Sequence, residues 1–142
     1  MAHFTVFAND LLDQELANGA SGTFTVGATT YTLPLRIQPT STLCTDAAKG
    51  TEWTGGSYVA GGLSLAGLVA TAATARSKSN TTAITQTGCP ATTLADFAIV
   101  DSTGTPKLMT YKGTPSIAKT INAGDTLVIP IGSLTASYTA GA

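Results

Sequence analysis

From Ser21 onward, apolar and polar residues alternate in short runs, and apolar residues at helical spacing are almost absent. The runs are rich in Thr, Val, Ile, Tyr and Phe, which favour strands, and they are bounded by Gly, Pro, Asn and Asp. The pattern predicts strands over residues 23–26, 31–37, 58–65, 83–84, 94–100, 107–112, 117–121, 126–131 and 134–138. This regular spacing predicts an all-β fold, a single-domain antiparallel β-sandwich of jelly-roll-like form.

Two turn sequences support this arrangement. Residues 101–104 read Asp-Ser-Thr-Gly and residues 122–125 read Asn-Ala-Gly-Asp, and each lies between two apolar runs. Asp and Asn side chains hydrogen-bond to nearby backbone groups, and Gly accepts a positive φ. Both stretches therefore predict tight connections between strands.

The N-terminal region differs from the rest of the chain. Residues 8–17 predict a short helix, because Asn9 can cap it, Asp10 and Asp13 suit its positive end, and Gly19 follows it. We therefore expect an N-terminal arm with a helix in residues 1–20 and the β-sandwich in residues 21–142. Residues 66–75 are rich in Ala, but Thr and Gly interrupt them, so a helix and a loop are equally good interpretations there.

The polar surface must consist mostly of hydroxyl groups. The 142 residues include 27 Thr and 10 Ser, whereas charged residues make up only 11% of the chain and the net charge is −1. No basic cluster is present to neutralise phosphates, so nucleic acid and anionic membranes are not expected as partners. A nearly neutral chain that is 43% hydrophobic favours association with other proteins, and we expect a homo-oligomer in its assembly.

The N-terminus carries no signal-peptide pattern, and the apolar-rich residues 61–75 are interrupted and shorter than the roughly 20 residues of a membrane span. We therefore expect synthesis in the cytosol. Cys44 and Cys89 have no Cys or His nearby in sequence that would complete a metal site. Two reduced, buried thiols are the favoured interpretation, and a disulfide formed after release from the cell is the alternative.

Catalytic residues are not expected. The single histidine, His3, lies near the N-terminus, so a histidine-based triad is not predicted. The carboxylates fit cap, loop and turn positions better than a catalytic pair, and they include Glu15, Glu52, Asp96, Asp101 and Asp125. Neither a metal nor another cofactor is expected. The glycine-rich residues 50–67 lack the Gly-Lys-Ser/Thr ending of a phosphate loop and predict bulges and tight turns.

Trp53 and Tyr58 are the most prominent aromatic residues within this glycine-rich region. A single Trp either anchors a core or forms the centre of an interface, and we favour the core for Trp53 while keeping both residues as interface candidates. The same pair could also stack on a sugar. Further interface candidates come from the N-terminal arm, which we expect to dock on a neighbouring subunit through Phe4, Val6, Phe7, Leu11 and Leu12.

Several short motifs occur in a recognisable order. Residues 51–58 read Thr-Glu-Trp-Thr-Gly-Gly-Ser-Tyr, residues 80–84 read Asn-Thr-Thr-Ala-Ile, residues 96–101 read Asp-Phe-Ala-Ile-Val-Asp, and residues 123–127 read Ala-Gly-Asp-Thr-Leu. In this order the chain resembles a family of small tailed-phage virion proteins, which carry a Glu-x-x-Gly-Gly-x-Tyr stretch. Residues 9–16 and 31–37 resemble the opening helix and first core strand of that family.

The resemblance implies a non-enzymatic structural role in the virion. We expect a capsid decoration or cement protein that binds and stabilises the shell of the major capsid protein, together with contacts to neighbouring virion subunits. A tail or tail-fibre component is the first alternative. A carbohydrate-binding module for host glycan is the second, and it depends on exposed aromatic residues.

Overall fold

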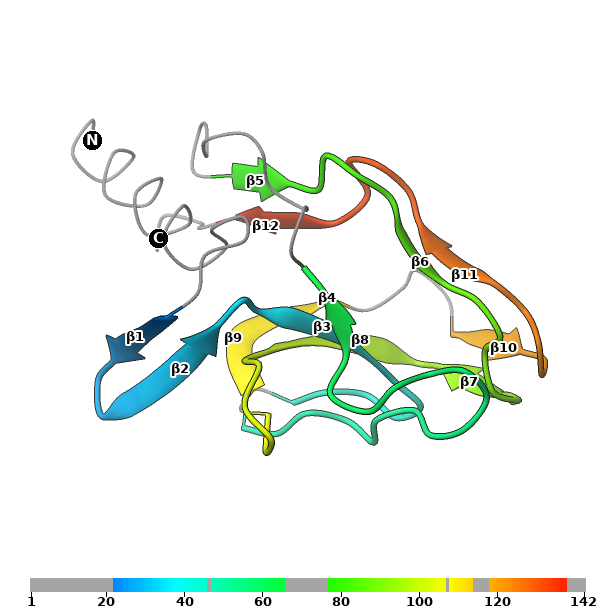
Figure 1. Cartoon of the computed structure of the whole chain (residues 1–142), viewed down its shortest axis with the longest axis horizontal. Helices are drawn as coiled ribbons and strands as arrows, with labels where there is room; N and C mark the ends of the chain where they lie inside the picture. The colour runs from blue at the N-terminus through cyan, green and yellow to red at the C-terminus, as the bar shows by residue number, and fades with distance from the viewer. Residues whose placement is uncertain (1–21, 46, 66–76, 107, 114–117, 138–142) are drawn as a thin grey trace.

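The computed structural model describes residues 22–45, 47–65, 77–106, 108–113 and 118–137 of the chain. Within these residues all regular structure is β, arranged in antiparallel sheets (Figure 1). The predicted helix at residues 8–17, the arm at residues 1–20 and the ambiguous stretch at residues 66–75 lie outside the described residues. No helix in the described part of the chain is long and apolar enough to cross a membrane.

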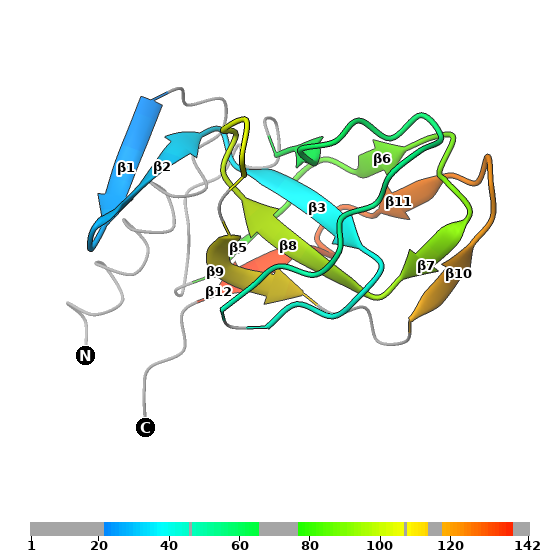
Figure 2. The same ribbon diagram turned by 90° about the horizontal axis from the view of Figure 1, so that it is seen from below.

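The centre of the fold is a four-stranded sheet in the order β4-β3-β8-β9. Its two inner strands are fully paired over five positions, from Arg36 opposite Val100 to Thr40 opposite Asp96. The strands are β3 (Arg36–Thr40), β4 (Leu63–Ser64), β8 (Asp96–Val100) and β9 (Leu108–Gly113). Figure 2 shows β3 and β8 side by side across the middle of the molecule.

The second half of the chain folds back on itself in nested strand pairs. β5 (Ser77–Ser79) pairs with β12 (Thr135–Ser137), and β6 (Ile84–Gln86) pairs with β11 (Leu127–Ile129). Inside these, β7 (Thr92–Leu94) pairs with β10 (Lys119–Ile121), and β8 pairs with β9. Four successive strands thus run antiparallel to the next four in reverse order, which is the pairing of a jelly roll and agrees with the predicted fold class.

The main core lies between the central sheet and the β6–β11 pair. Ile37 of β3 and Ile99 of β8 pack in one cluster with Ile84 of β6 and Ile129 of β11, joined by Leu35 and Leu65. All six side chains are at most 8% exposed. On β6 and β11 the alternate neighbours Thr85 and Val128 are exposed, as expected for a strand with one buried face. On the central strands β3 and β8 the neighbours Gln38, Ala98 and Val100 are buried as well, so both faces of these strands are covered.

The predicted strand at residues 31–37 is in fact two strands. β2 (Thr29–Leu33) pairs with β1 (Gly22–Val26) in a hairpin, whereas β3 pairs with β8, and Pro34 lies between them after a cis peptide bond. Proline has no N–H for a ladder, so it marks the point where the chain leaves one sheet for the other. The predicted strand at residues 94–100 also divides, at Ala95, since β7 pairs with β10 and β8 with β3.

Two further expectations were wrong. Of the predicted strand at residues 58–65 only Leu63–Ser64 is a strand, because Gly61 and Gly62 adopt φ values of +105° and +95° that a regular strand does not contain. Conversely, Ser77–Ser79 forms β5, which was not predicted. Its Ser-Lys-Ser sequence has no apolar alternation, and only its pairing with β12 makes it a strand.

Candidate functional site

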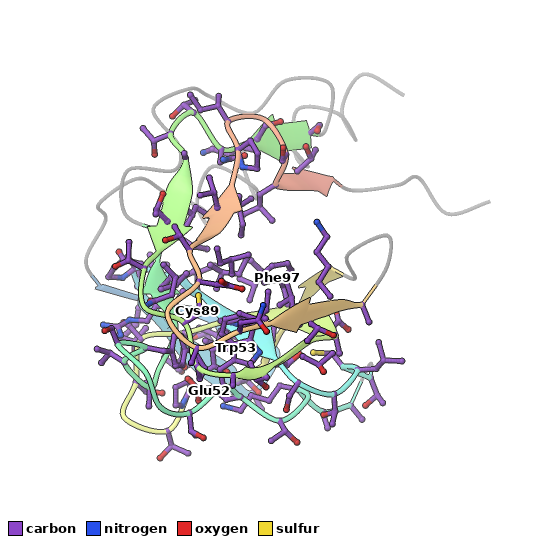
Figure 3. The ribbon with its side chains drawn as sticks, turned by 90° about the vertical axis from the view of Figure 1, so that its right-hand side faces the viewer. Glu52, Trp53, Cys89 and Phe97 are labelled. Carbon is purple, nitrogen blue, oxygen red and sulfur yellow. The ribbon has the colours of Figure 1, made fainter. Side chains whose placement is uncertain are left out.

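Trp53 and Tyr58 lie in the interior. They are 1% and 7% exposed, and their rings make an edge-to-face contact with centroids 6.3 Å apart. Cys89 and Leu94 complete this buried group, which we call the Trp53 cluster. Figure 3 labels Trp53 and Cys89 of this cluster together with Glu52. The indole N–H donates a hydrogen bond to the Thr93 carbonyl at 3.0 Å. The core interpretation of Trp53 is therefore correct, and the side chains of Trp53 and Tyr58 are not at the surface as interface residues require.

The same burial removes the basis for sugar stacking. A ring that stacks on a sugar must present a free face, whereas both faces of the Trp53–Tyr58 pair are enclosed by the chain's own residues. The glycan-binding alternative depended on this pair, so it loses the feature that motivated it.

Glu52 closes the loop that carries the two aromatic residues. One carboxylate oxygen, Oε1, accepts hydrogen bonds from the Tyr58 hydroxyl at 2.7 Å and from the Gly61 N–H at 2.6 Å. Burial raises the pKa of the Tyr58 phenol far above its ordinary value, and the hydrogen bond and negative charge of Glu52 raise this pKa further. Tyr58 therefore stays protonated as a hydrogen-bond donor, and the pair serves to hold residues 52–61 in place.

The glycines of this loop permit close approach of the backbone. Gly56 has φ of +60°, and a Cβ atom there would lie 2.9 Å from the Cys89 carbonyl carbon and from the Pro90 nitrogen. A Cβ atom at Gly62 would lie 2.9 Å from the Ile37 carbonyl oxygen. The expected tight turns are thus confirmed, and the glycines position the loop against two other segments of the fold.

The carboxylates of the turns bind the chain's own backbone. Asp96 is 1% exposed and accepts hydrogen bonds from the N–H groups of Cys44 at 2.9 Å and Phe97 at 2.8 Å. Asp101 is fully buried and accepts from the Thr32 N–H at 3.2 Å, and Asp125 accepts from the Asn122 N–H at 2.8 Å. Asp101 and Asp125 act in turns as predicted. Asp96 lies at a strand end as predicted, but its bond to Cys44 holds together two segments that are distant in the sequence.

Cys44 and Cys89 are free thiols and both are buried. Cys89 belongs to the Trp53 cluster, whereas Cys44 packs against Ala98 and Val100 in a separate cluster. The reduced, buried interpretation therefore agrees with the structure. Within the described ranges, no group of three or more His, Cys, Asp or Glu residues is placed to hold a metal ion.

Exposed apolar side chains mark surfaces that the sequence interpretation missed. The large ones are Leu43, Val59, Val128 and Ile131, which are 48–74% exposed. Val128 could have been found from the sequence, because it alternates with Leu127 and Ile129, which face the interior. The other interface candidates, Phe4, Val6, Phe7, Leu11 and Leu12, lie outside the described residues, and docking through them stays a prediction.

One comparison with known proteins places the chain in a family. A family model described as podophage GP4 fiber I protein gp80 matches residues 5–137, which includes the Trp53 cluster and every described strand. No curated protein and no solved structure matches the chain.

Proposed function

The chain belongs to the podophage GP4 fiber I protein gp80 family, and we propose that within the virion it is a structural component of a fibre. The observation that carries the proposal is the length of the family match, which covers residues 5–137. The family description supports a phage virion structural protein, and it fits the fibre alternative better than the capsid decoration role that we had expected. A partnership with the major capsid protein has no support from this description.

The interior of the molecule agrees with a structural role. Glu52, Asp96 and Asp101 are each engaged by hydrogen bonds from the same chain, so they act as supports of loops and turns. These roles support the proposal that the chain is not an enzyme. We also retain neighbouring virion subunits as its proposed partners. A chain with few charged residues suits contacts between subunits more than contacts with charged ligands, because charged residues are depleted in the cores of protein interfaces.

The copy number and position of the protein in purified particles test this proposal. Quantitative mass spectrometry of virions should give a small number of copies relative to the major capsid protein, and antibody labelling in electron micrographs should mark fibres. Labelling spread over the whole shell, with a copy number close to that of the major capsid protein, would restore the decoration role and contradict the fibre proposal.

A second test uses particles assembled without the protein. If the protein belongs to a fibre, a phage that lacks its gene should still form DNA-filled heads of normal stability, because the shell does not depend on the protein. Adsorption to the host should be reduced. Heads that lose DNA on mild heating in the absence of the protein would instead indicate a cement.

A further inference from the structure

The β1–β2 hairpin lies at one end of the molecule (Figure 1), and among the described residues β1 pairs with no strand other than β2. The hydrogen bonds of Thr32 in β2 show which backbone N–H and C=O groups of the hairpin point between the two strands and which point outward. The Thr32 N–H donates to the Asp101 carboxylate at 3.2 Å, and the Thr32 carbonyl accepts from the Ser102 N–H at 3.0 Å. Both backbone groups of Thr32 therefore point away from β1.

Residues that face each other in an antiparallel pair alternate between hydrogen-bonded and non-hydrogen-bonded pairs. Because Thr32 does not bond to β1, its partner Thr23 belongs to a non-hydrogen-bonded pair, and so does Thr25 opposite Thr30. The Thr25 and Thr30 hydroxyl oxygens lie 3.0 Å apart, as the closer approach in such a pair allows. The N–H and C=O groups of Thr23 and Thr25 therefore point outward, away from β2.

These outward groups have no partner among the described residues, where β1 has β2 as its single neighbour in the sheet. Natural proteins protect open edges with short strands, charged residues or proline. The strands β4 to β7 and β10 to β12 have three residues or fewer, and the longer edge strand β9 contains Lys112. By contrast, β1 has five residues, and residues 22–33 contain neither a charged residue nor a proline.

We propose that β1 is a self-association edge, on which β1 of a second copy of this chain pairs antiparallel about a two-fold axis at Phe24. In this register Thr23 faces Thr25 of the second copy, and each such pair can exchange two backbone hydrogen bonds. The edge is its own complement, because the two outward residues are spaced identically on both copies and the axis lies at the middle of the strand. Without charges on the hairpin, no like-charge repulsion opposes the pairing.

So short an edge gives a weak dimer of isolated chains, and attachment of several copies to one assembly would strengthen it. The proposal does not depend on the fibre role, since it concerns the isolated chain. Disulfide cross-linking is suited to a weak contact, because each dimer that forms transiently is captured covalently and covalent dimers accumulate with time.

The register is tested with two single variants, Thr23→Cys and Thr25→Cys, whose side chains are exposed. In the mixture the two cysteines face each other, and the Cα atoms of a hydrogen-bonded pair lie about 5.5 Å apart, which a disulfide can span. In either variant alone the two cysteines are diagonal neighbours roughly 7–8 Å apart, which a disulfide does not span. Mild oxidation of the mixed variants should therefore give a covalent dimer, and each variant alone should remain largely monomeric. The unmodified chain is the control for cross-linking through its own cysteines, Cys44 and Cys89, which are buried. Equal cross-linking in all samples, or none in the mixture, would overturn the proposed register.

A second pair of variants tests the backbone contact itself. Thr25→Pro removes an outward N–H that the hairpin does not use, so the fold should survive, whereas Thr25→Ala keeps that N–H. Sedimentation at high protein concentration should show dimer for the unmodified chain and for Thr25→Ala, with association at least about tenfold weaker for Thr25→Pro. Thermal unfolding verifies that both variants are folded. Equal association of the two folded variants, or a purely monomeric unmodified chain, would contradict pairing through β1.

Discussion

The Trp53 cluster, which includes residues of a glycine-rich loop, and the β1–β2 hairpin differ in how their hydrogen-bonding groups are used. The indole N–H and the Tyr58 hydroxyl of the Trp53 cluster, and the Glu52 carboxylate beside it, all bond within the chain. On β1 the outward backbone groups of two threonines have no partner among the described residues. The aromatic pair that looks like a binding site in the sequence is thus an internal support, whereas a threonine-rich stretch with no binding motif offers the open edge.

The largest expected effect comes from removing the centre of the Trp53 cluster. Trp53→Ala should destabilise the fold by about 3–5 kcal/mol, because it removes a large buried ring and leaves a cavity. Urea unfolding measures the change. The exposed neighbour Thr54 is the matched control, and Thr54→Ala should change the free energy of unfolding by less than about 0.5 kcal/mol. Similar values for the two variants would mean that the ring does not support the core.

A smaller loss is expected when the carboxylate of Glu52 is removed. Glu52→Ala leaves the Tyr58 hydroxyl and the Gly61 N–H without their acceptor and should cost about 1–3 kcal/mol. Glu52→Gln retains a carbonyl oxygen at this position and should cost less. Urea unfolding of both variants separates the hydrogen bonds from the charge. If Gln is as destabilising as Ala, the negative charge of Glu52, and not its role as an acceptor, holds the loop.

The protonation of Tyr58 predicts a loss of stability at alkaline pH. The pKa of this phenol is raised in the folded chain by burial and by Glu52, whereas in the unfolded chain it is about 10. The unfolded chain therefore releases this proton first as the pH rises, so the contribution is complete below about pH 10 and declines above it. Unfolding free energies from pH 8 to 11 should fall less steeply for Tyr58→Phe than for the unmodified chain. Identical slopes would exclude Tyr58 as a source of the decline.

The smallest effect on stability is expected on the hairpin. Thr25→Ala removes the exposed hydroxyl contact with Thr30 and should change the free energy of unfolding by less than about 0.5 kcal/mol. The Trp53 cluster and the hairpin would then differ severalfold in their contribution to the fold. A loss above about 1 kcal/mol would show that the hairpin supports the sandwich as strongly as an internal element does.

Several features of this protein could be predicted from the sequence, because they depend on neighbours in the chain. Alternation of apolar and polar residues indicated an all-β fold, since successive side chains of a strand point to opposite faces. The turn roles of Asp101 and Asp125 could also be predicted, because Asp101 bonds to Thr103 within its own turn and Asp125 to the backbone of Asn122. These interactions are local, so three or four residues of sequence are enough to indicate them.

Tertiary structure alone decided which strands pair and which side chains they enclose. Pro34 and Ala95 divide what the sequence presents as continuous strands, because the segments on either side find partners in different sheets. Likewise, Ser77–Ser79 becomes a strand through residues 135–137, far away in the sequence. The burial of Trp53 and the open edge of β1 have the same origin. Both depend on which of the described segments lie beside them in the folded chain, and no short-range pattern contains that information.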